Sequence, residues 1–119
     1  MYEDYDLDFI IGQELIIFST DFMYIIWFKF SDMVITLEGK LEFGNLSGDK
    51  HYMDPSSGIF IFDSLKIFAQ KRIVSYRIIE EDGLFISFHD DLYMKFLFNN
   101  SRYESFTIND RNNGLSVFW

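Results

Sequence analysis

A block of apolar, polar and again apolar residues occurs twice in this chain, and it constrains the fold more than any other feature. Residues 28–35 read Phe-Lys-Phe-Ser-Asp-Met-Val-Ile, and residues 86–93 read Ile-Ser-Phe-His-Asp-Asp-Leu-Tyr. Asp32 and Asp90 are 58 positions apart, whereas the preceding Gln13 and Gln70 are 57 apart, so one insertion aligns the halves. Each copy is typical of strand–turn–strand. We therefore expect Asp32 and Asp90 to occupy equivalent turns of two superimposable hairpins.

Alternation with a period of two dominates the first half of the chain. In residues 35–43 it predicts a single half-buried antiparallel strand. The residues expected on its buried side are Ile35, Leu37, Leu41 and Phe43. The preceding run from Phe22 to Phe30 is apolar on both faces until Lys29, which favours a central strand.

Further strands are expected at regular spacing in the second half. They are predicted near Arg72–Glu80, Leu84–His89, Leu92–Phe98, Tyr103–Ile108 and Leu115–Trp119. The Asp82-Gly83 step between the first two is a strong hairpin signal. Gly44–Gly58 is expected to be the only long irregular segment, either a crossover loop or a binding loop, and a short helix is predicted over Ile59–Phe68.

These patterns predict one domain over residues 1–119 with an all-β, mainly antiparallel fold. We expect a β-sandwich or a partly closed barrel of about eight strands, built from two repeated hairpin units, with one short helix. A chain of this length buries roughly two-thirds of its unfolded surface, which is enough for a core without disulfides.

Composition narrows the environment and the partner. The chain has no cysteine and a formal charge of −9, and its first residues are acidic where a signal peptide would be basic. No apolar run approaches 18 residues, so we expect no membrane association and a cytoplasmic location. The negative charge opposes binding to nucleic acid and favours a basic protein partner, although it also suits a solubilising surface.

Residues suited to catalysis are scattered. The two histidines, His51 and His89, stand in no motif with a base or a ligand partner, and the glycines form no phosphate-binding loop. We therefore expect no enzyme activity, no metal site, no cofactor and no site shared by the two histidines.

Two kinds of residue are candidates for contact with a protein partner. The first kind is the acidic residues of the turns, which could instead be ordinary solvated surface charges. The second kind is the aromatic residues that we expect to face outward. The predicted contact residues are Glu80, Glu81, Asp82, Asp90, Asp91, Trp27 and Tyr93. Phe85 and Trp119 are also expected to point outward.

A cluster of basic residues supports an alternative function. The cluster consists of Lys66, Lys71, Arg72 and Arg77, and the fold could bring Arg102 and Tyr103 close to them. Inside a barrel these residues would hold the carboxylate of a lipid-like ligand among the many phenylalanines. On the wet side of a strand they would be ordinary surface cations.

Several motifs together resemble a group of small bacterial two-repeat β proteins. They are Gly12-Gln13-x-Leu15, Phe30-x-Asp32, Ala69-Gln70-x-x-Ile73, Glu81-Asp82-Gly83-Leu84 with Phe88-x-Asp90, and Tyr103-Glu104-Ser105-Phe106. Phe106 and Ala69 depart from the Trp and Gly of that pattern. Such proteins are similar to immunity proteins of contact-dependent growth inhibition and polymorphic-toxin systems. The resemblance implies an antitoxin that blocks the active site of a toxin, expected to be a nuclease, and it brings no catalytic residues.

Overall fold

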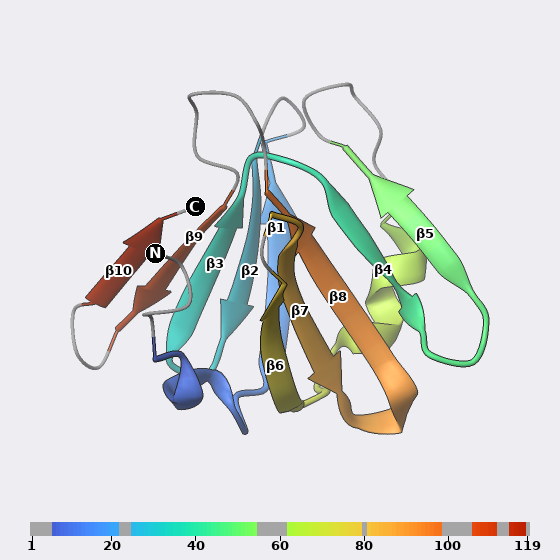
Figure 1. Cartoon of the computed structure of the whole chain (residues 1–119), viewed down its shortest axis with the longest axis horizontal. Helices are drawn as coiled ribbons and strands as arrows, with labels where there is room; N and C mark the ends of the chain where they lie inside the picture. Colours follow the sequence, from blue (N-terminus) through green and yellow to red (C-terminus); the bar gives the residue numbers. More distant parts are fainter. Residues whose placement is uncertain are drawn as a thin grey trace.

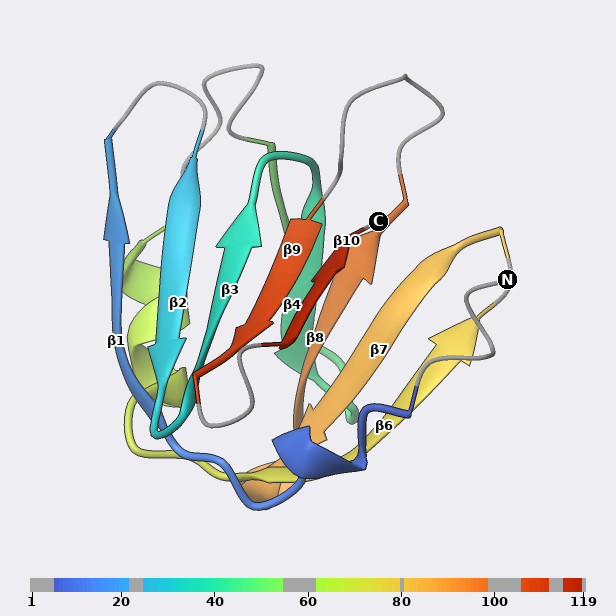
Figure 2. The ribbon, with the colours of Figure 1, turned by 90° about the vertical axis from the view of Figure 1, so that its left-hand side faces the viewer.

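Two five-stranded antiparallel sheets pack face to face (Figures 1 and 2). The structure is a computed structural model of the chain and describes residues 6–21, 25–54, 62–79, 81–98, 106–111 and 115–118. The first sheet contains, in spatial order, β1 (Leu15–Thr20), β2 (Ile26–Phe30), β3 (Met33–Leu37), β9 (Phe106–Asp110) and β10 (Leu115–Phe118). The second contains β5 (Lys50–Met53), β4 (Leu41–Asn45), β8 (Leu92–Leu97), β7 (Gly83–Phe88) and β6 (Ile73–Ile79). The predicted sandwich is confirmed, and the sheets do not close into a barrel.

Each half of the chain contributes to both sheets. The first half supplies β1 to β5 and the second supplies β6 to β10. The first three strands of each half form one sheet, and its last two strands join the sheet of the other half. The order β1-β2-β3-β9-β10 is thus repeated as β6-β7-β8-β4-β5, which relates the halves by an approximate two-fold axis.

Hydrogen bonds between the halves fix their alignment. The Gly12 amide donates to the Ile73 carbonyl at 2.8 Å, and the Gln70 amide donates to the Leu15 carbonyl at 2.8 Å. These mirrored bonds make Gly12 the equivalent of Gln70 and Leu15 the equivalent of Ile73. Equivalent residues of the two halves are therefore already 58 positions apart before the hairpins begin. The expected match of Gln13 with Gln70 through an insertion is therefore wrong; the shared glutamines are a coincidence of sequence.

The repeated hairpins themselves are confirmed. β2 pairs with β3 around the turn that holds Asp32, and β7 pairs with β8 around the turn that holds Asp90. The second turn, the 3-10 helix η5 (His89–Asp91), is one residue longer than the first, so equivalent residues are 59 positions apart after it. Asp90 and Asp91 both have a positive φ, at 66° and 61°. The strand that enters each hairpin sheet, β1 or β6, also carries an irregularity at the same place, after Leu15 or Ile73.

The single strand predicted over residues 35–43 is wrong in one respect. β3 ends at Leu37 and β4 begins at Leu41 in the opposite sheet, so the chain crosses between the sheets at Glu38–Lys40. The predicted buried side is correct, because Ile35, Leu37, Leu41 and Phe43 are all fully buried. Alternation alone cannot distinguish one straight strand from two strands that face each other across a core.

The segment Gly44–Gly58 is not simply a loop. Its first part forms the β4–β5 hairpin, and residues 55–61 lie outside the described part of the chain. Gly44 permits the tight pairing, since a Cβ there would lie 2.0 Å from the carbonyl oxygen of Asp49. The helix predicted over Ile59–Phe68 appears as the 3-10 helix η4 (Asp63–Phe68), which Phe62 precedes as N-cap, and residues 59–61 lie outside the described part.

η4 has a counterpart that the sequence did not reveal. The 3-10 helix η2 (Asp8–Ile10) precedes β1 as η4 precedes β6. Leu7 and Ile10 are buried, as are Leu65 and Phe68 at the same offset of 58. The Tyr76 hydroxyl holds η2 by accepting from the Leu7 amide at 3.1 Å and donating to the Asp8 carboxylate at 2.9 Å.

The remaining strands lie close to their predicted places. β6, β7 and β8 fall within one or two residues of the predicted bounds, and β9 and β10 overlap theirs where the chain is described. The Asp82-Gly83 hairpin exists, but the residue with positive φ is Glu81, at 64°. Gly83 is needed for a different reason, because a Cβ there would lie 2.2 Å from the carbonyl oxygen of Phe96.

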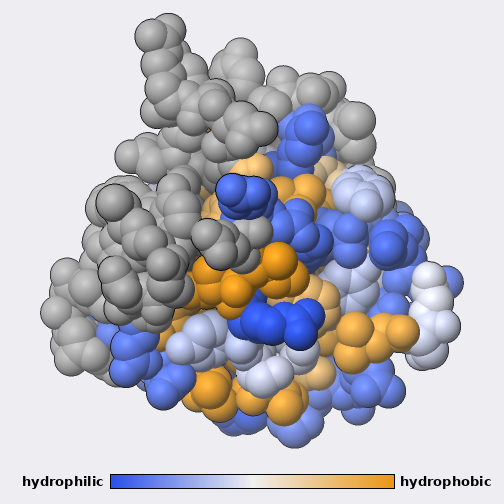
Figure 3. Space-filling view, viewed as in Figure 1, coloured by the Kyte–Doolittle hydropathy of each residue, from blue (hydrophilic) through white to orange (hydrophobic). Residues whose placement is uncertain are grey.

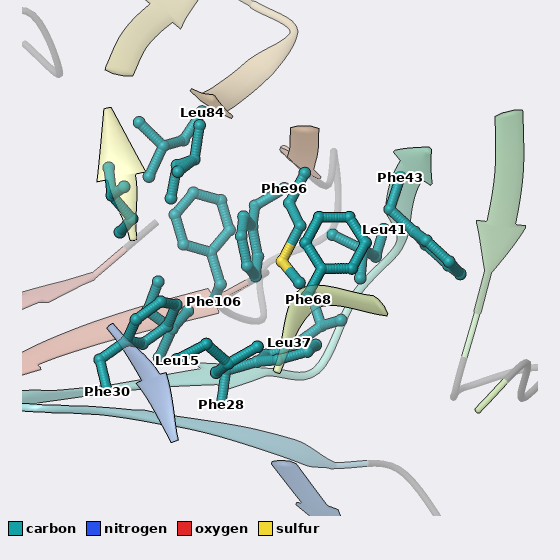
Figure 4. Close-up of a cluster of buried hydrophobic side chains, with 14 of the residues drawn as sticks. Leu15, Phe28, Phe30, Leu37, Leu41, Phe43, Phe68, Leu84, Phe96 and Phe106 are labelled. Carbon is teal, nitrogen blue, oxygen red and sulfur yellow. The ribbon is translucent and has the colours of Figure 1, made fainter. Parts of the chain in front are cut away.

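Phenylalanine fills the space between the sheets (Figure 4). The Phe96 ring lies edge-on to Phe28 at 5.7 Å and tilted against Phe106 at 5.5 Å, which joins strands of both sheets. Phe68 of η4 meets Phe88 edge-on at 5.2 Å. Burial of each such ring contributes about 2–3 kcal/mol, so the many phenylalanines are explained by the core.

Candidate partner-binding surface

The predicted contact residues lie in four places rather than on one surface. Glu81 and Asp82 precede β7, whereas Asp90 and Asp91 follow it, so about 20 Å of strand separates the two acidic turns. Trp27 lies on the outer face of the first sheet and Tyr93 on the outer face of the second. Glu80 lies outside the described residues. The two outer faces point in opposite directions, so one flat contact cannot include both aromatics.

Two of the acidic side chains are paired with lysines. Asp90 binds Lys71 through an ion pair that lowers the pKa of the carboxyl, first through the hydrogen bond and then through the positive charge. Asp82 pairs with Lys95 at 2.5 Å. Glu81 and Asp91 are exposed. The acidic turns therefore present less free charge than their sequence indicates.

One group of side chains on the outer face of the second sheet is organised by its own contacts. We call it the Tyr–Glu face, and it consists of Glu42, Tyr52, Arg77, Phe85 and Tyr93. The Tyr52 hydroxyl donates to Glu42 Oε1 and the Tyr93 hydroxyl donates to Glu42 Oε2, both at 2.8 Å. The carboxylate is thus held between two phenols from neighbouring strands.

Aromatic stacking extends this face across β6 to β8. The Phe85 and Tyr93 rings are parallel within 8° with centroids 5.2 Å apart, and the Arg77 guanidinium lies 5.6 Å from the Phe85 centroid. Cation–π and stacking contacts of this kind contribute about 0.5–1.5 kcal/mol each. Polar and apolar residues are interspersed where β6, β7 and β8 face the viewer in Figure 3.

The phenols stay protonated in this arrangement. Burial raises the pKa of Tyr93 above its usual range, and the hydrogen bond to Glu42 raises it further. The pKa of Tyr52 is raised mainly by its hydrogen bond to Glu42 and by the negative charge of that carboxylate. Tyr93 is only 4% exposed, whereas Tyr52 is 55% exposed. Glu42 is therefore a fixed carboxylate between one rigid and one accessible hydroxyl.

A surface hollow of about 400 Å³ adjoins the Tyr–Glu face. Glu42, Phe85 and Tyr93 form one side of it, and the β4–β5 turn, residues 45–48, forms the other together with Lys50. The Leu46 amide ties this turn to the Asp91 carbonyl at 2.8 Å. The hollow therefore has walls from both halves of the chain, and its turn is anchored.

A second hollow, of about 370 Å³, lies where the halves cross. Arg72 lines it and is engaged in holding the halves together, since it pairs with Glu14 at 3.1 Å and donates to the Gly12 carbonyl at 2.9 Å. Gln13 also lines it, and its side-chain oxygen accepts from the Asp32 amide at 2.8 Å. These contacts give the hollow a structural explanation.

The four basic residues of the cluster that the structure describes do not gather into a ligand site. Lys66 pairs with Asp63, and the other three members of the cluster contact the three different groups named above. Arg102 and Tyr103 lie outside the described residues. Since the sheets do not form a barrel, the fold provides no lumen in which this cluster would face a ligand.

The histidines occupy different environments. His51 of β5 packs its ring 5.3 Å from that of Phe43, and His89 begins η5. Within the described ranges, no three His, Cys, Asp or Glu side chains are grouped so that they could hold a metal ion.

Glu42, Tyr52 and Arg77 were not predicted as contact residues. The alternation correctly places Glu42 on an outer side, but its meeting with Tyr93 depends on pairing between β4 and β8, 51 positions apart in the chain. A strand pairing between the two halves has no local signal in the sequence.

Comparisons of the chain with protein-family models, with curated proteins and with solved structures find no match. No helix among the described residues has the length and apolar character that a membrane crossing requires.

Proposed function

We propose that this protein is a cytoplasmic immunity protein that binds a basic toxin, a nuclease, and blocks its active site without chemistry of its own. The observation that carries the proposal is the Tyr–Glu face, where a carboxylate and aromatic rings are held ready on an outer sheet surface. Interfaces favour such side chains, because Tyr buries a large area with little loss of conformational entropy.

The charge of the chain supports the same kind of partner. A formal charge of −9 attracts a basic protein over long range and accelerates association. The exposed Glu81 and Asp91 lie near the two ends of β7 and would steer the partner rather than anchor it. Neutralising Glu80, Glu81 and Asp82 together should lower the association rate more than it raises the dissociation rate.

The test uses the purified chain and a purified basic nuclease domain of a toxin encoded beside it. We expect a stable complex in size-exclusion chromatography, loss of nuclease activity at an equimolar ratio, and slower association as salt rises above about 0.1 M. Full nuclease activity in excess of this protein would contradict the proposal. Association that does not depend on salt would remove the electrostatic part of it.

Two substitutions in the same assay identify the contact face. Tyr52→Ala removes the aromatic of the Tyr–Glu face that is 55% exposed, and Trp27→Ala removes one from the first sheet. We expect Tyr52→Ala to accelerate dissociation by about tenfold or more, as for a central interface aromatic, and Trp27→Ala to leave it nearly unchanged. The reverse pattern would move the contact to the first sheet.

A further inference from the structure

The Tyr–Glu face contains a carboxylate whose contacts are hydroxyl groups. Tyr52 and Tyr93 each donate one hydrogen bond to Glu42, and each bond uses a different carboxylate oxygen. A carboxylate can accept about four hydrogen bonds, so this arrangement leaves Glu42 able to accept more. The two phenol oxygens also keep acceptor capacity beside it.

The rings next to Glu42 suit a planar cation. Arg77 already places a guanidinium against Phe85 from the side of β6, and Tyr93 extends the same stack toward Glu42 and the hollow. A guanidinium combines stacking on aromatic rings with paired donation to a carboxylate, whereas an ammonium group offers only a compact charge. The hollow of about 400 Å³ is large enough for a single side chain.

We propose that the hollow beside Glu42 receives an arginine side chain of the protein partner, with the guanidinium bonded to Glu42 and packed against the edge of the Phe85–Tyr93 stack. This inference rests on the proposed function for the source of the arginine, but the site itself is a property of this chain. The anchored β4–β5 turn lines the hollow opposite Glu42.

Nearby positive charge sets the specificity of the site. Lys95 is the register neighbour of Glu42 but is paired with Asp82, so its charge is largely compensated. Lys50 lines the hollow and is exposed, so it competes with an incoming cation. Removing the charge of Lys50 should therefore strengthen the binding of arginine, whereas removing the charge of Glu42 should weaken it.

The experiment follows side-chain NMR signals of Tyr52, Phe85 and Tyr93 in the full chain during titration with N-acetyl-arginine amide. N-acetyl-citrulline amide, which has nearly the same shape without the charge, and N-acetyl-lysine amide are compared at constant ionic strength. We expect saturable shifts with the arginine probe in the millimolar range, affinity at least about fivefold lower for lysine, and no saturable shift with citrulline.

Substitutions decide whether Glu42 is responsible. Glu42→Gln should weaken the arginine probe by about tenfold, the loss of a hydrogen bond to a charged group, and Lys50→Ala should strengthen it a few-fold. Glu38→Gln is the matched control, because it removes the same charge from an exposed residue between β3 and β4 and should leave affinity unchanged. Tyr52→Phe keeps the ring and checks the site without loss of a charge.

Equal affinity of Glu42→Gln and the unsubstituted chain for the probe would overturn the inference, as would shifts spread over the acidic turns instead of this face. The toxin assay separates this result from the proposed function. If the nuclease binds the Glu42→Gln variant and the unsubstituted chain equally, the protein is an inhibitor but the proposed arginine site is wrong. If the probe binds and the nuclease does not, the site stands and the proposed function fails.

Discussion

The two halves of the chain differ least where their side chains point inward and most where they point outward. Four inward pairs at the offset of 58 are apolar and buried: Leu7 and Leu65, Ile10 and Phe68, Ile26 and Leu84, and Phe30 and Phe88. Close packing explains this agreement, because a polar or much smaller residue in any of these places would cost several kcal/mol, on the order of 2–5.

Outward pairs agree less. Four of the five residues of the Tyr–Glu face, Arg77, Phe85, Tyr93 and Glu42, are matched in the first sheet by Ser19, Trp27, Val34 and Thr107, and Phe118 takes the place of Tyr52. Aromatic residues recur at two of these five positions, whereas the carboxylate and the two hydroxyls do not. Nothing in the sandwich requires the carboxylate or the two phenols, since the other half forms the same sheet without them. The difference therefore points to the second sheet as the specialised surface, which supports the proposed contact face.

The largest effect is expected from separating the halves. Because each sheet takes strands from both halves, a fragment of residues 1–54 alone leaves β1-β2-β3 without β9, and β4-β5 without β8. We expect neither residues 1–54 nor residues 62–119 to show a cooperative thermal transition by circular dichroism. An equimolar mixture should recover the β spectrum of the whole chain.

A folded monomer formed by either fragment would contradict the strand exchange. A folded homodimer of one fragment would sharpen the comparison instead, because it would show that the inward residues of that half are complementary to themselves. Sedimentation equilibrium distinguishes the two outcomes.

Gly83 tests a difference in backbone packing between the halves. Its equivalent in the first half is Ile25. β3 ends at Leu37, which pairs with Ile26, so no residue of β3 pairs with Ile25 and a side chain is accepted there. At Gly83 a Cβ would meet the Phe96 carbonyl, and Gly83→Ala should lower the free energy of unfolding by about 1–3 kcal/mol. Gly48→Ala is the control, since a Cβ there has nothing within 4 Å, and chemical unfolding measures both. Equal stabilities of the two variants would show that the β7–β8 contact relaxes freely.

The sequence predicted those parts of the fold that have local signals. The alternation identified the buried residues of β3 and β4, and the turn residues located the β6–β7 and β7–β8 hairpins. The crossing at Glu38–Lys40 was missed because period two is the same before and after a change of sheet. The Gln13–Gln70 alignment failed because residue identity was used where backbone position decides.

The candidate surface was harder to predict than the fold. Tyr93 was predicted as a contact residue, but its partner Glu42 comes from the other half of the chain. Acidic residues were chosen by their clustering in sequence, although Asp82 and Asp90 each have a lysine beside them that is 13 and 19 positions away. Surfaces assembled from distant strands require the topology to be known first.

Gly12 and Gln70, which occupy equivalent positions in the two halves, test how much a positive φ costs in stability. Both have positive φ, at 88° and 66°, where a residue with a side chain is strained by about 1 kcal/mol. Gly12→Ala should therefore destabilise the chain by about 1 kcal/mol, and Gln70→Gly should stabilise it by a few tenths to about 1 kcal/mol. Ala69→Gly is the neighbouring control, with φ of −59°, and should destabilise by about 0.5–1 kcal/mol. A loss of stability in Gln70→Gly would mean that the Gln70 side chain compensates for its backbone strain.

The smallest effect is expected at Lys71, which occupies the position equivalent to Gln13 of the first half. Lys71 lowers the pKa of Asp90, and a carboxyl with a lowered pKa in the folded state stabilises the protein above its unfolded value of about 3.9. That contribution disappears as the pH falls through the folded-state pKa.

Lys71→Gln makes the second turn resemble the first, so the pKa of Asp90 measured by NMR should rise toward its ordinary value. The loss of stability as the pH falls below the ordinary pKa of a carboxyl should become shallower, by a small amount because the pair is exposed. Lys66→Gln breaks a different lysine–aspartate pair and should leave the titration of Asp90 unchanged. An Asp90 carboxyl that titrates identically with and without Lys71 would show that the ion pair adds nothing in solution, and that the two turns differ in sequence but not in electrostatics.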